Sequence, residues 1–202
     1  DDRARLFEEL PAKVVRQLLD QLSPEERKVT AELLGYEAET AGRLMTTEYI
    51  ALKENQTALE ALDIVRRRAR DTETIYSLYV TDNERRLTGI LSLRDLVTAD
   101  PHTLIRDVMT EEVLSVRTNT DQEKVARTIQ RYDFLAVPVV DLEQRLVGIV
   151  TVDDVIDVIE QEATRDLYAA GAVQAGDEDD YFSSNLFTVA RRRVVWLAVL
   201  VV

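Results

Sequence analysis

The chain has 202 residues, of which 46% are hydrophobic, a formal net charge of −13 and no cysteine. A protein that binds nucleic-acid phosphates needs a basic surface, so this charge disfavours nucleic acid as a partner. Without thiols the chain has neither disulfides nor a soft zinc site, whereas hard cations held by oxygen ligands remain possible.

Helical patterns dominate the first 40 residues. Apolar residues recur at helical spacing over residues 6–22. A second helix is expected from Pro24, because Ser23 can act as its N-cap and Glu26 can close a capping box. Gly35 is placed to end this helix. The segment is too short to form a domain alone, so we interpret it as the remnant of a larger helical domain.

An internal repeat begins near Met45 and determines the expected architecture. Residues 86–96 match residues 145–155, 59 positions later. Residues 57–60 match residues 120–123, but 63 positions later. The first copy therefore carries about four extra residues between its first helix and its second strand.

Each copy predicts the order strand, helix, strand, turn, strand, helix. Short apolar runs at 76–80 and 136–140 indicate covered strands, and the segments 57–70 and 121–132 indicate amphipathic helices. A copy of about 60 residues is marginally stable alone. We therefore expect the two copies to pack sheet to sheet in one α+β unit.

The helix at 121–132 illustrates the amphipathic pattern. Val125, Ile129 and Tyr132 are expected on its inward face. Its outward face is expected to carry Glu123, Lys124, Arg127 and Arg131.

Residues 148–166 combine a buried strand with an unusually acidic helix. After the turn at Thr151, six acids and one base, Arg165, fall between Asp153 and Asp166. Like charges on one helix repel one another, so either this face is simply well solvated or a cation binds to it. The helix dipole accounts for acids in the first turn but not for those near the helix end.

The C-terminal residues predict a membrane helix that is cut short. Three arginines, 191–193, precede nine apolar residues, 194–202. A bilayer-spanning helix needs about 20 such residues, but a basic cluster followed by Trp and aliphatic residues is typical of its cytoplasmic end. A C-terminal strand or amphipathic helix is the alternative. The acidic tract 174–180 is expected to be a linker.

No catalytic pattern stands out. The sequence contains no P-loop, no dinucleotide-binding fingerprint and no nucleophile–base pair, so we expect no enzyme. The single histidine, His102, lies in the loop-like stretch Asp-Pro-His-Thr and is expected at the surface.

The repeat carries a specific signature, glycine, two hydrophobic residues, Ser or Thr, and Asp three positions later. It occurs twice, as Gly89, Ser92 and Asp95 and as Gly148, Thr151 and Asp154. In this respect residues 45–162 resemble a tandem CBS module, a pair of βαββα repeats.

The flanking motif Thr-Ala-Gly-Arg-Leu-Met-Thr at 40–46 resembles the leading motif of the MgtE family of magnesium channels, with Arg43 where that family usually has Gly. The resemblance extends over the whole chain and implies a division into five parts. These are a helical N-domain remnant (1–40), CBS domain 1 (41–108), CBS domain 2 (109–163), a connecting helix with an acidic linker (164–190) and the start of a truncated transmembrane helix (191–202).

The resemblance implies regulatory Mg²⁺ sites. The positions that match the family's metal ligands are Glu123, Asp133, Asp154, Asp157, Glu162, Asp166 and the backbone carbonyl of Gln130. Arg165 stands where the family commonly has an acid, so one site is expected to be weakened or replaced by an internal salt bridge. Lys13 and Arg16 stand on the N-domain helix that usually supplies acids, and neither can ligate a cation.

The resemblance also implies a candidate site for ATP or AMP. Its residues are Ser92, Arg94, Asp95, Phe134, Thr151 and Asp154. Arg94 can hold phosphate and Phe134 can stack on adenine. As an alternative, Asp95 and Asp154 simply cap the helices that follow them.

The expected function is therefore that of a Mg²⁺-sensing regulatory region. The resemblance implies a homodimer formed through the CBS domains, on the cytoplasmic side of the inner membrane, that closes a pore domain when Mg²⁺ binds. Two alternatives remain open, an adenine-nucleotide-sensing CBS module that regulates a partner and a purely structural dimerisation module.

Overall fold

The computed structural model describes residues 10, 12–19 and 21–170, with the side chains of a few helical residues excepted. The chain divides into two compact units, with the boundary between Ile159 and Glu160. Everything up to Ile159 belongs to the first unit, and the final part of the last described helix belongs to the second.

Among the described residues before the repeat are the helices α2 (Ala12–Leu19) and α3 (Pro24–Leu34). The predicted capping box is confirmed, because Glu26 N donates to Ser23 Oγ at 3.3 Å and Ser23 N donates to Glu26 Oε2 at 3.0 Å. Gly35 is the C-cap, in the right-handed region at φ −77°. The short helix α4 (Ala41–Leu44) follows, and Arg43 Nη1 donates to the Leu33 carbonyl at 3.0 Å.

The first copy of the repeat forms a three-stranded sheet in the order β1-β2-β3. Strand β1 runs parallel to β2, and β2 runs antiparallel to β3. Its elements are β1 (Ala51–Lys53), α5 (Ala58–Arg68), β2 (Ser77–Thr81), β3 (Leu87–Ser92), α6 (Leu93–Thr98) and the 3₁₀ turn η1 (Ile105–Asp107).

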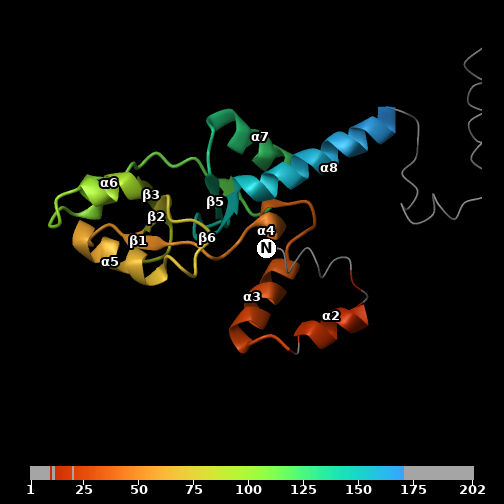
Figure 1. The fold of residues 1–202 in the computed structure, drawn as a ribbon, viewed down its shortest axis with the longest axis horizontal. Helices are drawn as coiled ribbons and strands as arrows, with labels where there is room; N and C mark the ends of the chain where they lie inside the picture. The colour runs from red at the N-terminus through yellow and green to blue at the C-terminus, as the bar shows by residue number, and fades with distance from the viewer. Residues whose placement is uncertain (1–9, 11, 20, 171–202) are drawn as a thin grey trace, which may run out of the picture. The chain divides into compact units, whose positions relative to one another are not determined.

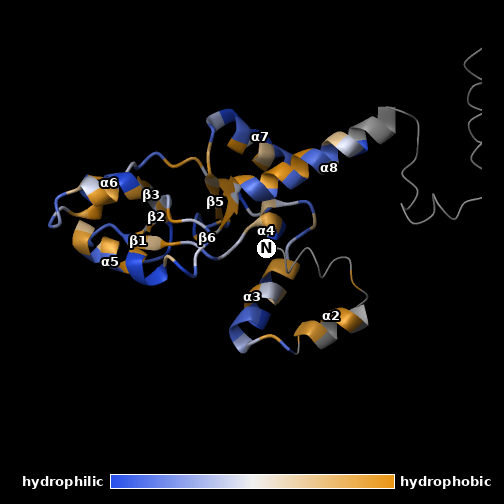
Figure 2. Ribbon diagram, viewed as in Figure 1, coloured by the Kyte–Doolittle hydropathy of each residue, from blue (hydrophilic) through white to orange (hydrophobic). Residues whose placement is uncertain are grey.

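The second copy repeats this arrangement, with the strand order β4-β5-β6 and the same parallel and antiparallel pairings. Its elements are β4 (Val116–Arg117), α7 (Gln122–Tyr132), β5 (Ala136–Val140), β6 (Leu146–Thr151) and α8 (Val152–Ala170). The predicted order strand, helix, strand, strand, helix is confirmed in both copies (Figure 1). The strands are predominantly hydrophobic, whereas the helices carry both hydrophobic and hydrophilic residues (Figure 2).

The structure corrects the predicted alignment of the two helices by one residue. The N-caps are Thr57 for α5 and Asp121 for α7, so the helices are related by 64 positions and not 63. In the second copy Thr120 instead accepts from Arg117 N at 3.0 Å, as Gln56 accepts from Lys53 N at 2.8 Å. The sequence match aligned Thr120 with Thr57 because both begin a Thr-x-x-Glu pattern, but the residue that caps α7 is Asp121, one position later. With the strands still 59 positions apart, the first copy carries five extra residues.

Hydrogen bonds tie the two copies together. The segment before the first copy pairs with the last strand of the second, because Thr46 and Ile149 exchange both backbone hydrogen bonds at 2.8 and 2.9 Å. Conversely, the segment before the second copy pairs with the last strand of the first, because Thr110 and Ile90 exchange both backbone hydrogen bonds at 2.8 and 2.9 Å. Besides a core within each copy, a third cluster joins them, formed by Tyr79, Ala136, Leu146 and Ile149. The expectation that the copies bury strand faces against each other is thus confirmed.

Tyr132 departs from its expected place on the inward face of α7. Val125 and Ile129 are buried as expected, together with Ala126, but Tyr132 is 48% exposed. Helix α7 ends at Tyr132, and the left-handed backbone of its C-cap, Asp133 (φ 53°), turns the chain away. The Tyr132 ring therefore lies beyond the core and stacks on Phe134, with 5.5 Å between the ring centres.

Two predictions concern residues outside the described part of the chain, the truncated membrane helix at 194–202 and the acidic linker at 174–180. Among the helices that the structure does describe, none is both long and apolar enough to cross a bilayer. His102 is exposed, as expected, and its backbone N donates to Asp100 Oδ1 at 2.9 Å.

Candidate functional site

An acidic surface forms where α8 begins. The helix turns Val155 and Val158 into the core, with exposures of 1% and 2%. The same periodicity leaves Asp153 and Asp157 exposed and Asp154 half-buried. Packing of the apolar face therefore fixes the direction in which these carboxylates point.

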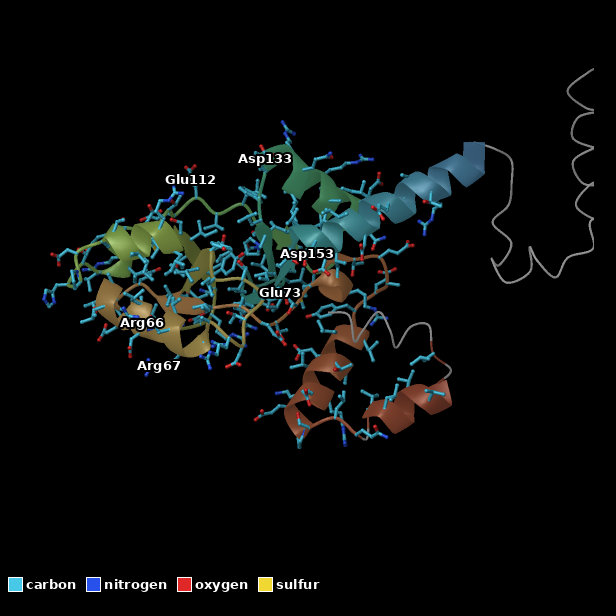
Figure 3. The ribbon with its side chains drawn as sticks, in the orientation of Figure 1. Arg66, Arg67, Glu73, Glu112, Asp133 and Asp153 are labelled. Carbon is cyan, nitrogen blue, oxygen red and sulfur yellow. The ribbon has the colours of Figure 1, made fainter. Side chains whose placement is uncertain are left out.

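Two acids from the first copy join this surface, and sequence reasoning missed both. The backbone N of Glu73 donates to the Glu48 carbonyl at 2.8 Å. Partial burial, and then the negative charges of Asp153, Asp154 and Glu48, raise the pKa of Glu73 above its usual value. Glu73 and Asp153 are labelled in Figure 3. The only feature of the sequence that sets Glu73 apart is its position among the extra residues of the first copy, between the first helix and the second strand.

Helix α7 carries three of the predicted metal-site residues on or beside its exposed face. Glu123 forms a hydrogen-bonded ion pair with Arg127 one turn later. Asp133 is the exposed C-cap of α7, and its backbone N–H donates to the Ile129 carbonyl. Gln130 is exposed. Glu123 already has a cationic partner, so a bound metal would have to compete with Arg127 there.

The last part of α8 lies in the second unit and contains the two remaining candidates. Glu162 Oε1 accepts from Arg165 Nη1 at 3.0 Å, so the internal salt bridge that Arg165 was expected to offer is present. Asp166 lies in α8, but its side chain is outside the described residues, as are those of Lys13 and Arg16 in α2.

These carboxylates do not form a closed cage. Across the described residues, no group of three or more histidines and acids is positioned to hold a metal ion. The donors are oxygen atoms on exposed or half-buried side chains, and this donor set fits Mg²⁺ that retains most of its water. The described residues therefore offer no direct multidentate metal site.

The candidate nucleotide residues form two equivalent pairs. Ser92 caps α6, accepting from Asp95 N at 3.1 Å and donating from Oγ to Asp95 Oδ2 at 2.6 Å. Thr151 Oγ1 donates to Asp154 Oδ2 at 3.0 Å. The alternative that Asp95 caps its helix is therefore wrong, because Ser92 is the cap and Asp95 supports it three residues later.

The two other nucleotide candidates differ in their surroundings. Arg94 is exposed and forms no ion pair within the described part of the chain. Phe134 is half-buried, stacks on Tyr132 and packs against the core of the second copy. Arg94 is thus available to an anion, whereas Phe134 already has a ring partner.

Comparison with known proteins agrees with this architecture. The CBS domain family matches residues 41–102 and 105–161, and the MgtE intracellular N domain matches residues 1–39. A magnesium transporter MgtE from Thermus thermophilus is 50% identical over 186 residues, 92% of this chain and 41% of the relative. One from Bacillus subtilis is 41% identical over 200 residues, 99% of this chain and 44% of the relative. The chain therefore spans about two fifths of the length of these curated relatives.

Solved structures lead to the same family. The cytosolic domain of the Mg²⁺ channel MgtE in complex with ATP superposes with a TM-score of 0.72 at 53% identity, over 75% of this chain and 60% of that one. The soluble part of a magnesium transporter superposes with a TM-score of 0.77 at 49% identity, over 79% of this chain and 62% of that one. The chain thus belongs to the MgtE family of magnesium transporters, of which it carries the intracellular N domain and the tandem CBS pair.

Proposed function

We propose that this chain is the Mg²⁺-sensing cytosolic region of a magnesium channel. The observation that carries the proposal is the convergence of Glu48, Glu73, Asp153 and Asp154, drawn from both CBS copies, on one surface, where partial burial and then the neighbouring charges raise the pKa of Glu73. The relatives named as magnesium transporters support the identity of the cation.

The mechanism follows from electrostatic repulsion. Without Mg²⁺ the acids of this surface, together with Asp157, repel one another and favour an open arrangement of the protein. Hydrated Mg²⁺ reduces this repulsion and binds the closed arrangement more tightly, so the population shifts toward the closed state. In the full-length protein the closed state would hold the pore shut, and low Mg²⁺ would release it.

The proposal includes a homodimer formed through the CBS domains, held on the cytoplasmic side of the inner membrane by a pore domain. Apolar side chains exposed on the CBS helices support a second copy as partner. They include Val97 on α6, 60% exposed, and Ile156 and Ile159 on α8, 51% and 41% exposed. Burying such residues against a second copy is more favourable than leaving them in water.

The test is thermal unfolding of the full chain during a Mg²⁺ titration into the range of tens of millimolar, the order expected for weakly held hydrated Mg²⁺. NaCl at matched ionic strength controls for general screening. We expect Mg²⁺ to stabilise the wild type more than NaCl does, and Asp153→Asn with Asp154→Asn to remove most of the difference. Equal effects of Mg²⁺ and NaCl on the wild type would sink the proposal.

A second candidate function is adenine-nucleotide binding, and it is compatible with the first. It rests on the hydrogen-bonded pair Ser92 and Asp95, on the neighbouring exposed Arg94 and on the related structure solved with ATP. Isothermal titration with ATP, ADP and AMP tests it. We expect Arg94→Ala to weaken binding, whereas Arg66→Ala, which removes an exposed arginine from α5 of the same copy, should leave it unchanged. If the wild type binds none of the three nucleotides, this candidate is rejected.

A further inference from the structure

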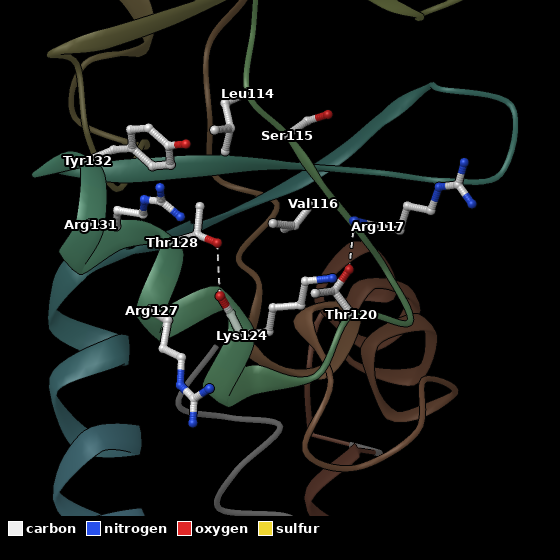
Figure 4. A pocket seen from close by; sticks show the side chains of 10 residues that line it. All are labelled: Leu114, Ser115, Val116, Arg117, Thr120, Lys124, Arg127, Thr128, Arg131 and Tyr132. Carbon is white, nitrogen blue, oxygen red and sulfur yellow. Dashed lines mark hydrogen bonds between the residues drawn. The ribbon is translucent and has the colours of Figure 1, made fainter.

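A basic hollow lies between α7 and the segment 114–117, and none of its lining residues belongs to the acidic surface. Its volume is about 520 Å³, and four cationic side chains line it, Arg117, Lys124, Arg127 and Arg131 (Figure 4). None of the candidate nucleotide residues lines the hollow. In a chain of net charge −13, this local concentration of positive charge requires an explanation.

Most of these cations lack an acidic partner. Arg127 pairs with Glu123, but Arg117, Lys124 and Arg131 form no ion pair with any residue that the structure describes. On α7 the spacing of Lys124, Arg127 and Arg131 is three and then four residues, so like charges lie on one helix face. Such spacing is unfavourable without a counter-charge.

The fold does not require this charge, because the first copy lacks it. With the helices related by 64 positions, Lys124 corresponds to Glu60, Arg127 to Asp63 and Arg131 to Arg67. Arg67 has a partner in Asp63, at 3.6 Å. The fourth cation, Arg117, corresponds to Lys53, whose ammonium donates to Thr81 Oγ1 at 3.0 Å and to the Asp82 carbonyl. In the first copy only two of the four positions carry cations, and both of these are paired or hydrogen-bonded. In the second copy all four positions carry cations, and three of them form no ion pair within the described residues.

The remaining lining indicates the class of ligand. Ser115 and Thr120 bring hydroxyl groups to the hollow, whereas the Thr128 hydroxyl already donates to the Lys124 carbonyl at 2.9 Å. The Arg131 guanidinium lies 5.7 Å from the centre of the Tyr132 ring, within the range of a cation–π contact. Guanidinium groups match the geometry of phosphoryl oxygens, and hydroxyl groups donate to the same oxygens. Leu114, Val116 and Tyr132 offer apolar contacts to an organic part of the ligand.

We propose that this hollow binds an anion that carries phosphoryl groups with two or more negative charges. The volume exceeds the needs of one inorganic phosphate and suits a small organic molecule. Two sources share this chemistry, a soluble phosphorylated metabolite and the headgroup of an anionic phospholipid. The inference goes beyond Mg²⁺ sensing and does not depend on it, because the hollow shares no residue with the acidic surface.

The test uses the full chain in Mg²⁺-free buffer of low ionic strength, titrated calorimetrically with pyrophosphate. Pyrophosphate carries the phosphoryl charge without an adenine ring, so it does not need the stacking partner Phe134, and the variants below distinguish binding in the hollow from binding at Arg94. We expect the double variant Lys124→Glu with Arg131→Glu to raise the Kd at least tenfold. The matched control is Arg67→Glu, at the position in the first copy that corresponds to Arg131, and its Kd should equal that of the wild type. All three substituted side chains are exposed, and thermal unfolding checks that the variants remain folded.

A second arm separates the two sources. The same proteins are floated with phosphatidylcholine vesicles, with and without phosphatidic acid. Binding of pyrophosphate alone assigns a soluble ligand, and flotation that requires both phosphatidic acid and the intact hollow assigns a lipid headgroup. The proposal is overturned if neither probe binds, or if the double variant binds both as the wild type does. Because the Mg²⁺ titration is a separate measurement, failure here leaves the proposed Mg²⁺ sensing untouched.

Discussion

The Sδ atom of Met45 lies where a side chain on Gly148 would begin. A Cβ on Gly148 would lie 2.6 Å from that sulfur and 2.8 Å from the Thr46 carbonyl oxygen. In the other half of the molecule a Cβ on Gly89 would lie 2.5 Å from the Met109 sulfur. A methionine side chain therefore packs directly against the glycine of each CBS signature. Met45 lies before the first copy in the chain but packs against the second copy.

The two glycines should differ in their response to alanine. At Gly148 the Thr46 carbonyl is part of the backbone and accepts a hydrogen bond from Ile149 N at 2.9 Å, so it cannot withdraw freely. At Gly89 the three nearest atoms all belong to the flexible Met109 side chain. We expect Gly148→Ala to lower the free energy of unfolding by about 1–3 kcal/mol, the range for overpacking, and Gly89→Ala to lower it less. Urea denaturation measures both.

Replacing each methionine by alanine tests whether the loss of stability comes from contact with the methionine side chain. Met109→Ala should relieve the overpacking in the Gly89→Ala background, whereas Met45→Ala should not rescue Gly148→Ala because the Thr46 carbonyl remains. Equal losses for the two glycines, or full rescue of both, would contradict this account.

The second prediction concerns Tyr79, which is fully buried where the two copies meet. Its hydroxyl has no hydrogen-bond partner among the described residues, and burial raises the pKa of Tyr79 far above its ordinary value. A buried hydroxyl without a partner is unfavourable by about 1–3 kcal/mol. We expect Tyr79→Phe to be at least as stable as the wild type in chemical denaturation.

Tyr49 is the matched control for Tyr79. The two rings meet edge to face, with 6.2 Å between their centres, but the Tyr49 hydroxyl donates to the Leu146 carbonyl at 3.1 Å. Tyr49→Phe should therefore destabilise the protein by about 1 kcal/mol, the usual value of one hydrogen bond. A larger loss from Tyr79→Phe than from Tyr49→Phe would show that the Tyr79 hydroxyl has a stabilising partner.

The sequence predicted features that depend on local patterns. The capping box at Ser23, the strand at 136–140 and the order of elements follow from spacing and residue type, and the structure confirms them. The helix alignment failed by one residue because two adjacent residues, Thr120 and Asp121, can both cap, and a pattern match cannot weigh them.

Features that depend on tertiary contacts were missed. Glu73 stands 80 positions before Asp153 in the chain, and only the packing of the two copies brings their charges together. Likewise, the exposed cations of α7 were predicted, but the hollow that they line with Arg117 requires the edge strand β4 beside the helix. Neither juxtaposition follows from a local sequence pattern, because the residues involved belong to segments that only the tertiary fold brings together.

The third prediction concerns the pH dependence that Glu73 contributes. Its pKa is raised in the folded state, so the protonated form is favoured there and the native state binds more protons than the unfolded one. The stability that this group contributes is therefore fully present below the unfolded pKa and is lost as pH rises through the folded pKa. At pH 7 the ionised carboxylate faces Asp153 and Asp154 at a net disadvantage.

Glu73→Gln should accordingly be more stable than the wild type at pH 7 and lose this advantage in acid. The gain is expected to be about 0.5 kcal/mol or less, since Glu73 is only partly buried and solvent still screens most of its charge. Urea denaturation between pH 4 and pH 8 measures it, with Glu112→Gln, an exposed acid elsewhere, as control. A variant less stable than the wild type at pH 7 would show that Glu73 has a favourable partner instead.

The last prediction concerns Arg165, which stands where the resemblance to the family expects an acid. Arg165 pairs with Glu162 at 3.0 Å, three residues apart on α8. Replacing it in Arg165→Glu removes this pair and adds a negative charge beside Glu162, so the cation-free protein should lose about 0.3–0.5 kcal/mol of stability. The added acid increases the repulsion that Mg²⁺ relieves, and stabilisation by Mg²⁺ over matched NaCl should exceed that of the wild type. Arg165→Gln separates the two effects, because it breaks the same ion pair without adding charge. If the Gln and Glu variants respond equally to Mg²⁺ in thermal unfolding, the charge at position 165 plays no part in sensing.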